Sequence, residues 1–176
     1  EAWYAGLQEG GAPAAAAAER AELKRQREEA AAKDEANFKA MEALLAGRNV
    51  LTVMPTGSGK SLCFQVPALV LDGLTIVVSP LIALMQDQVA ALRLAGVAAD
   101  AINSSRSRAD NVATWHRVTS GETRLLYMAP ERLMTEPMLA ALGRLTVSLI
   151  AIDEAHCISQ WGPSFRPEYA DLSRLR

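Results

Sequence analysis

The stretch MPTGSGKSLCFQVPAL, residues 54–69, contains a glycine-rich loop of the kind that binds phosphate. An apolar run ends at Met54 and a helix-forming run begins near Lys60, which is the strand–loop–helix context that such a loop requires. Backbone N–H groups of the loop can converge on phosphate oxygens, assisted by the helix N-terminus. Lys60 would reach the β- and γ-phosphates, and the Ser61 hydroxyl would bind Mg²⁺. We expect the following residues to bind a nucleotide: Thr56, Gly57, Ser58, Gly59, Lys60 and Ser61.

The first position of this loop departs from the general phosphate-loop pattern. The pattern begins with glycine, whereas Met54 stands there, although the tight part of the cradle, Gly57-x-Gly59, is present. Beyond Lys39, Lys60 is the only lysine of the chain, which indicates a demand for that side chain inside the loop. The alternative is a plain Gly–Ser turn between a strand and a helix.

An acidic pair follows a second apolar run, in LIAIDEAH at residues 149–156. Asp153 would end a buried strand, where a carboxylate is costly unless it binds a partner. In a chain with a phosphate loop, Asp153 can hold Mg²⁺ together with Ser61, and Glu154 can orient and deprotonate the attacking water. A solvated turn would be the better explanation for an isolated Asp–Glu pair. His156, taken alone, is more often structural.

Short apolar runs alternate with helix-forming runs around these motifs. This alternation predicts an α/β fold with a mainly parallel sheet flanked by helices. Pro67 would kink or end its helix. We expect strands at residues 49–54, 74–79, 97–103, 123–128 and 147–153, and helices at residues 60–71, 81–96, 107–121 and 135–145.

The N-terminal part of the chain has a different composition. Residues 1–13 predict a loose tail, and residues 14–46 are strong helix formers. We therefore expect residues 1–32 to be accessory and residues 33–176 to form one nucleotide-binding domain. Gly47 would cap the helix. Apolar residues near its end, at helical spacing, would dock it on a core: Phe38, Met41, Leu44 and Leu45.

Composition excludes few functions. The formal net charge of the 176 residues is -2, so the overall charge does not indicate binding to nucleic acid. Cys63 and Cys157 cannot form a four-ligand zinc site alone, and a reducing intracellular setting is expected. No apolar run reaches membrane-spanning length. We expect a cytoplasmic location, which in a bacterium would be associated with the nucleoid.

Four segments together resemble the first RecA-like domain of RecQ-type DNA helicases, in helicase superfamily 2: MPTGSGKS, SPLIALMQDQV, YMAPERL and DEAHCISQWG. The DEAH tetrad alone indicates only the superfamily, whereas the continuation CISQWGPSFRPEY is far more specific. In that superfamily the phosphate loop begins with Ala or Met, which accommodates Met54. The resemblance covers residues 44–176 and implies a motor that uses ATP and Mg²⁺ to move 3′ to 5′ along DNA.

The resemblance also implies roles in DNA contact. Ser79, Pro80 and Leu81 match a motif that touches the single-stranded DNA backbone. A second strand-tracking motif is matched by Pro130, Glu131 and Arg132. His156 and Gln160 would link the ATP site to DNA.

Residues 159–169 match an aromatic-rich loop that, in the family, couples DNA binding to hydrolysis. Trp161 and Phe165 offer faces for base stacking, and Arg166 offers a phosphate or cation–π contact. The alternative is that Trp161, Phe165 and Tyr169 pack as a small surface cluster. Ser164 stands where the family often has an acidic residue.

The chain departs from the family most clearly upstream of the phosphate loop. The family has a Phe-Arg-x-Gly-Gln stretch there, whose glutamine recognises adenine. An ungapped alignment from Gly47 places residues 33–37 at this stretch, so Asn37, one methylene shorter than glutamine, is the candidate for the base contact.

The resemblance further implies a second RecA-like domain that residues 1–176 do not include. We therefore expect this chain alone to bind nucleotide weakly and to hydrolyse it slowly, if at all. Two other interpretations stay open. One is a catalytically silent nucleotide- or DNA-binding module, and the other is an RNA helicase domain.

Overall fold

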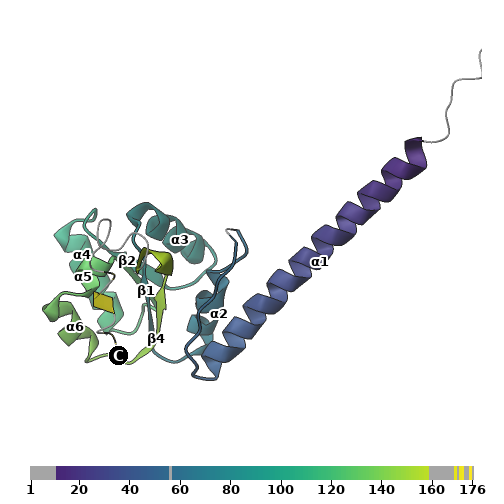
Figure 1. Ribbon diagram of the computed structural model, residues 1–176. Helices are drawn as coiled ribbons and strands as arrows, with labels where there is room; N and C mark the ends of the chain where they lie inside the picture. Colours follow the sequence, from purple (N-terminus) through teal and green to yellow (C-terminus); the bar gives the residue numbers. More distant parts are fainter. Residues whose placement is uncertain (1–10, 56, 159–168, 170, 173–174, 176) are drawn as a thin grey trace, which may run out of the picture. The chain divides into compact units, whose positions relative to one another are not determined.

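The computed structural model describes residues 11–55, 57–158, 169, 171–172 and 175, with side chains from residue 18 onward. The chain divides into two compact units, Glu1–Cys63 and Phe64–Arg176. Figure 1 shows the elements of both units. None of the helices in the described ranges combines the length and the apolar character that a membrane span needs.

The first unit is dominated by the long helix α1, Gly11–Leu45. Its exposed surface carries ion pairs at helical spacing, such as Lys39–Glu35 at 2.6 Å and Arg25–Glu22 at 2.8 Å. The helix ends at Leu45, and Gly47 caps it with a φ of 72°, which suits a residue without a side chain. The N–H of Arg48 donates to Ala43 O, which closes the last turn. The predicted helix and its glycine cap are therefore confirmed, except that the helix begins at Gly11, inside the stretch predicted to be a loose tail.

The expected docking face of α1 is partly wrong. Phe38 is 65% exposed, and the residues buried in this part of the helix are Asn37 and Ala40. Positions 37, 40, 41 and 44 lie within a sector about 100° wide on a 3.6-residue helix, whereas Phe38 and Leu45 lie about 90–110° from the centre of that sector. The apolar residues therefore divide between two faces, and the buried face includes an asparagine.

Residues 49–54 do not form the predicted strand. They are irregular, and Leu51 and Val53 are 80% and 88% exposed. Apolar residues favour extended backbone, but a strand also needs a neighbour to accept and donate its hydrogen bonds. No ladder among the described residues includes this segment.

The second unit contains a parallel sheet whose described strands follow the order β2-β3-β1-β4. β1 (Leu74–Val78) lies between β3 (Leu125–Met128) and β4 (Val147–Ile152), and β2 (Ala99–Ile102) pairs with the far side of β3. β1, β2 and β3 are fully buried, as their near-continuous apolar sequences predict. Four of the five predicted strands are thus present, each within a few residues of its expected bounds.

Helices cover both faces of this sheet (Figure 1). On one face, Val77 and Tyr127 pack with α3 (Ile82–Leu94) and with Ala68 of α2 (Leu62–Val70). On the other, Ile76 and Met128 pack with α4 (Arg108–Thr119) and α6 (Glu136–Leu142). Neighbouring residues of one strand face opposite layers, so the predicted two-sided α/β arrangement is confirmed.

Three local features differ from the sequence expectation. α2 continues through Pro67 to Val70, so the proline does not end this helix. A short helix, α5 (Pro130–Leu133), follows β3 with proline in its first turn. A 3₁₀ turn, η1 (Ala155–Ile158), follows the acidic pair. Hydrophobic periodicity in the sequence cannot predict either of these two short helices, because each is only about one turn long.

Candidate functional site

The glycine loop has the backbone of an anion cradle. Gly57 and Gly59 have φ values of 78° and 81°, which residues with a side chain seldom adopt. Ser58 closes the turn, since its hydroxyl donates to Pro55 O at 2.7 Å. Among the described residues, no acceptor is found for the N–H groups of Gly57, Gly59 or Lys60. Such N–H groups ahead of a helix can bind phosphate oxygens.

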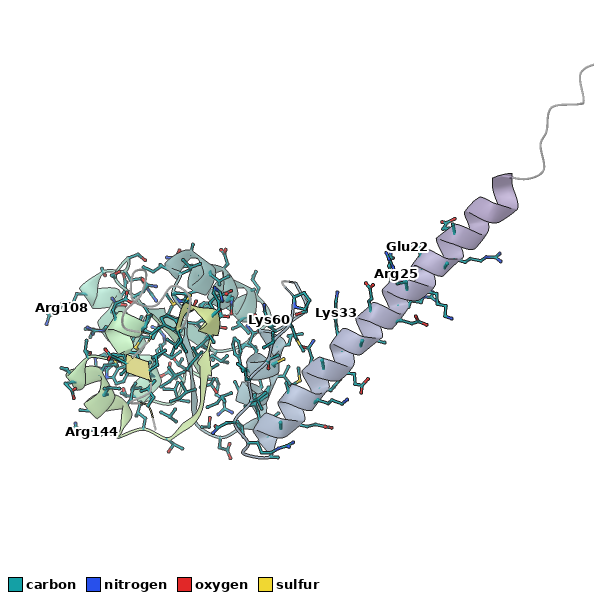
Figure 2. All side chains as sticks on the ribbon, viewed as in Figure 1. Glu22, Arg25, Lys33, Lys60, Arg108 and Arg144 are labelled. Carbon is teal, nitrogen blue, oxygen red and sulfur yellow. The ribbon has the colours of Figure 1, made fainter. Side chains whose placement is uncertain are left out.

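Lys60 lies back over this loop. Its Nζ donates to the backbone carbonyl of Met54 at 3.1 Å (Figure 2 labels Lys60). The acceptor is a backbone oxygen, so the contact places no demand on the side chain at position 54. Met54 does not have a positive φ, so its backbone conformation does not require glycine. Ser61 precedes the first turn of α2, where its hydroxyl oxygen suits Mg²⁺, which prefers oxygen ligands.

Asn37 joins α1 to the glycine loop. It is 6% exposed; its Nδ2 donates to Ser58 O at 3.0 Å, and its Oδ1 accepts from the Cys63 thiol at 3.1 Å. Both ends of the amide therefore contact the loop and the start of α2. A Cβ on Gly59 would lie 3.2 Å from Asn37 Nδ2, so a side chain there would push on the amide as well as strain a backbone with a φ of 81°.

Cys63 is held as a thiol in this cluster. Burial raises its pKa above the ordinary value of a cysteine. A neutral S–H is the form that can donate to Asn37 Oδ1, so burial and the hydrogen bond agree. Neither cysteine is in a disulfide, and Cys157 is buried in the second unit.

The acidic pair lies where β4 ends. The Asp153 N–H donates to Val78 O at 2.8 Å, which fixes the end of β4 against β1. The next residue turns sharply, since Glu154 has a φ of 51°, a left-handed conformation that costs a non-glycine residue about 1–2 kcal/mol. The Glu154 N–H donates to Asp153 Oδ1 at 3.0 Å, which helps to stabilise this turn.

His156 completes the acidic turn. Its Nδ1 lies 3.1 Å from Glu154 Oε2, so the imidazole orients this carboxylate. In the stretch of chain described, no three His, Cys, Asp or Glu side chains form a group that could hold a metal ion. A Mg²⁺ ion bound mainly by phosphate oxygens and water needs only one or two protein oxygens, so it does not require such a group.

A chain of polar side chains leads to Asp153 through the core. Gln65 of α2 donates to the hydroxyl of Tyr127 at 3.2 Å, and this hydroxyl donates to Gln88 Oε1 at 2.9 Å. Gln88 Nε2 in turn lies 3.5 Å from Asp153 Oδ2. Burial, together with the charge of Asp153, raises the pKa of Tyr127 to about 12, so the phenol stays protonated. Sequence reasoning missed these residues; the signal was a tyrosine within the apolar run LLYM.

The candidate DNA-contact residues of the second unit lie at strand ends. Ser79 follows β1 and is 1% exposed, and no described residue pairs with its hydroxyl. Pro80 is buried and Leu81 is exposed. Arg132 is exposed on α5, where Pro130 is buried in the first turn and Glu131 is partly buried. The structure thus brings both motifs to the same edge of the sheet, since β1 and β3 are parallel neighbours.

Tyr169 belongs to the core. It is 1% exposed, and its hydroxyl donates to Asp153 O at 3.1 Å, beneath the acidic turn. Its part in an exposed aromatic cluster is therefore excluded. Other predicted residues lie outside the described ranges: Thr56, Gln160, Trp161, Ser164, Phe165 and Arg166.

Comparisons with known proteins identify the family. A model of the DEAD/DEAH box helicases matches residues 35–176. The ATP-dependent DNA helicase RecQ of Haemophilus influenzae is 50% identical over 136 residues, 77% of this chain and 22% of that relative. RecQ of Bacillus subtilis is 48% identical over 130 residues, 74% of this chain and 22% of that relative. ATP-dependent DNA helicase Q1 of Rattus norvegicus is 41% identical over 146 residues, 77% of this chain and 23% of that relative.

The family match covers both motifs that suggested nucleotide chemistry, the glycine loop and the acidic turn. The chain spans about a fifth of the length of the RecQ relatives. Its second unit is an α/β structure with a parallel sheet, and the chain belongs to the DEAD/DEAH box helicases.

Proposed function

We propose that this chain is the ATP-binding motor domain of a DNA helicase that moves 3′ to 5′. The observation that carries the proposal is the acidic turn at the end of β4, where Glu154 keeps a strained left-handed backbone beside Asp153. Strain of this kind tends to persist where function requires it. The relatives from Haemophilus influenzae and Bacillus subtilis are named ATP-dependent DNA helicases, which supports the choice of DNA.

Each candidate residue then has a role in ATP hydrolysis. The loop N–H groups and Lys60 would bind the phosphates, and the strong charge of the lysine would act on the β- and γ-phosphates. Ser61 and Asp153 would hold Mg²⁺, which supplies positive charge against the phosphate oxygens. Glu154, oriented by His156, would take the proton of the attacking water.

Movement along DNA would need more than this chain. The chain spans 22% of the RecQ relatives, and unwinding in that family is expected to use a second motor domain. We therefore assign ATP and DNA binding to this chain and unwinding to a longer protein that contains it. Ser79, Pro80 and Arg132 would contact the DNA backbone, and Gln160, Trp161, Phe165 and Arg166 would couple this contact to hydrolysis.

Binding of MgATP to the chain, followed by calorimetry, tests the phosphate cradle. We expect Lys60→Ala to weaken affinity about tenfold or more, since it removes a charge-assisted hydrogen bond to phosphate. Lys33→Ala is the matched control, because Lys33 lies exposed on α1 in the same unit (Figure 2). Equal affinities for Lys60→Ala, Lys33→Ala and the unaltered chain would rule out the assignment of Lys60.

A further inference from the structure

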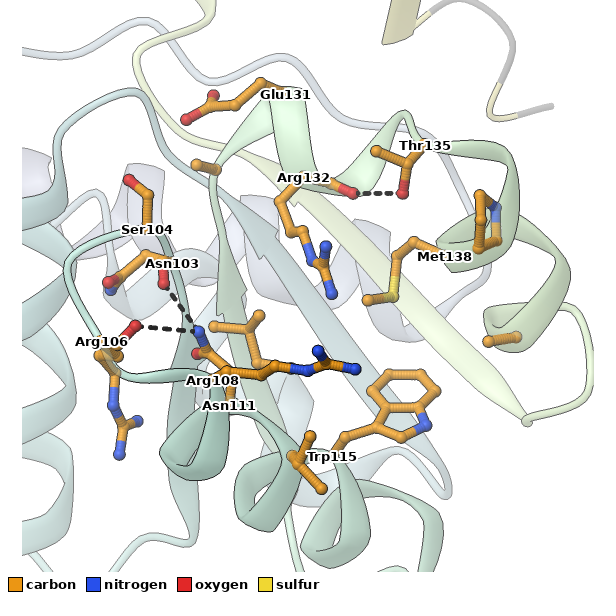
Figure 3. A pocket seen from close by; sticks show the side chains of 15 residues that line it. Asn103, Ser104, Arg106, Arg108, Asn111, Trp115, Glu131, Arg132, Thr135 and Met138 are labelled. Atoms are coloured by element: carbon orange, nitrogen blue, oxygen red, sulfur yellow. Dashed lines mark hydrogen bonds between the residues drawn. The ribbon is translucent and has the colours of Figure 1, made fainter.

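A cavity of about 990 Å³ opens in the second unit beyond the ends of β2 and β3. Its walls come from the segments after these strands and from α4, α5 and α6 (Figure 3). Ligands of open parallel sheets bind beyond the carboxyl ends of the strands, in pockets of roughly 300–1,000 Å³. Arg132 of the strand-tracking motif lines this cavity. The resemblance names no ligand for the cavity itself.

Two guanidinium groups face one another in this cavity. Arg108 from the start of α4 and Arg132 from α5 point toward each other across it (Figure 3). Neither forms a salt bridge with any residue in the described ranges. Glu131 points away from both (Figure 3). Two like charges that converge in this way favour an anion between them, and guanidinium groups bind phosphate oxygens with a matching geometry.

The loop that precedes Arg108 is held firmly. Asn111 Nδ2 donates to Asn103 O at 3.0 Å and to Arg106 O at 3.4 Å, as Figure 3 shows. Arg106 itself donates to Ala101 O at 2.8 Å. These bonds tie the loop between β2 and α4 to the end of β2, so the start of α4 is well positioned for binding.

An aromatic wall lies beside the two arginines. Trp115 follows Arg108 by seven residues on α4, which is two helical turns and hence the same face. It is partly buried against the core of the second unit, and Met138 lies opposite it across the cavity (Figure 3). An indole held in place by packing can stack on a nucleobase at little entropic cost.

We propose that this cavity binds one nucleotide of single-stranded DNA, with its phosphate between Arg108 and Arg132 and its base on Trp115. The inference rests on the proposed function and extends it, since Arg108 and Trp115 lie outside every motif of the resemblance. One pocket then supplies both a backbone contact and a base-stacking contact, the two ingredients of sequence-tolerant binding to single strands.

The sheet order favours a strand of DNA over a free nucleotide. β1, β3 and β2 are successive neighbours, so their carboxyl ends follow one another along one edge at a spacing of about 4.8 Å. Ser79 follows β1, Arg132 follows β3, and the loop before Arg108 follows β2. A polymer that crosses this edge would pass both candidate DNA motifs and then reach the cavity.

Binding of labelled single strands, measured by fluorescence anisotropy with the chain of 176 residues, tests the proposal. The two probes are an oligothymidylate and an abasic strand of the same length. We expect Trp115→Ala to weaken oligothymidylate binding about tenfold and to leave the abasic strand unaffected. Trp115→Phe, which keeps an aromatic face, should retain most of the affinity.

Arg108→Gln and Arg132→Gln should each weaken the binding of both probes by similar factors. Each should also reduce the magnitude of the slope of log affinity against log salt concentration by about one. Arg144→Gln is the matched control, an exposed arginine outside the cavity (Figure 2). Thermal melting of each variant establishes that it is folded.

DNA binding unchanged in the Trp115 and Arg108 variants would overturn the proposal and leave the proposed function standing. Displacement of oligothymidylate by equimolar thymidine monophosphate would also overturn it. If the unaltered chain bound no single strand, the DNA part of the proposed function would fail instead.

Discussion

At the residue scale, the environment of Asn37 differs most from the expectation. The resemblance places this residue where the family recognises adenine, yet both ends of its amide are engaged by Ser58 and Cys63. The amide keeps a second N–H and a second oxygen lone pair, but it is only 6% exposed and both of its ends are already held by the loop and by α2. Asn37 is thus set to position the phosphate loop.

Asn37→Ala should therefore weaken ATP and GTP binding by similar factors. The substitution leaves the buried Ser58 carbonyl and the Cys63 thiol without their partner, which should lower the free energy of unfolding by about 1–3 kcal/mol. Calorimetric titration with each nucleotide, alongside thermal melting, measures both effects. If only ATP binding suffered, Asn37 would contact adenine and the positioning role would be wrong.

Tyr127→Phe tests the polar chain through the core. The substitution removes the hydroxyl between Gln65 and Gln88, at an expected cost of about 1–3 kcal/mol in the free energy of unfolding, because two buried polar groups lose a partner. It should also lower the rate of ATP hydrolysis, since Gln88 contacts Asp153. Chemical denaturation of both proteins measures the first effect.

The pH dependence gives a separate signature of the same residue. The pKa of Tyr127 is about 12 in the folded protein and near 10 when unfolded, so the stability linked to its neutral form is present below pH 10. It is lost as the pH rises from 10 to 12. The free energy of unfolding of the unaltered chain should fall more steeply over this window than that of Tyr127→Phe. Parallel slopes would show that Tyr127 titrates as an exposed phenol.

At the element scale, alternation of apolar and helix-forming runs was enough to predict the sheet and its covering helices. The buried strands β1, β2 and β3 have apolar sequences because both of their faces are covered. The failures were local. Residues 49–54 have the composition of a strand, but composition supplies no pairing partner. In the site, the glycine loop and acidic turn were predictable from spacing, whereas Gln65 and Gln88 become functional candidates only through long-range packing.

Asp100→Asn tests how elements are joined around β2. Asp100 pairs with Arg93 of α3 and with Arg117 of α4 at 2.6 Å, and Thr123 donates to it at 2.7 Å. Burial acts to raise its pKa, but Arg117, Thr123 and Arg93 outweigh burial and hold the pKa below the usual value. We expect Asp100→Asn to lower the free energy of unfolding by about 1–3 kcal/mol near neutral pH.

Because the pKa of Asp100 is depressed on folding, the stability it confers is present above the pKa of the unfolded chain and is lost as the pH falls through the folded value. The difference between the unaltered chain and Asp100→Asn should thus shrink in acid. Denaturation at neutral and at acid pH measures it. A difference that does not vary with pH would show that the ion pairs contribute nothing.

At the scale of the whole molecule, α1 and the nucleotide-binding residues are separable in sequence. The exposed N-terminal part of α1 makes ion pairs within the helix, as between Lys24 and Glu28 at 3.8 Å, whereas Asn37 and Ala40 near its end are buried. Our division at residue 32 predicts that a chain lacking residues 1–32 binds MgATP with unchanged affinity. Calorimetry on the shortened chain checks this, and loss of binding or of folding would show that the whole of α1 is required.

Our main proposal is that Lys60 and Glu154 act in ATP hydrolysis that DNA stimulates. It is tested most directly by the rate of phosphate release, with and without single-stranded DNA, in a full-length protein that contains this chain. We predict stimulation by DNA that Lys60→Ala and Glu154→Gln each reduce by about a hundredfold or more, and that Lys33→Ala leaves unchanged. DNA-stimulated hydrolysis that persists undiminished in Lys60→Ala and Glu154→Gln would contradict this account.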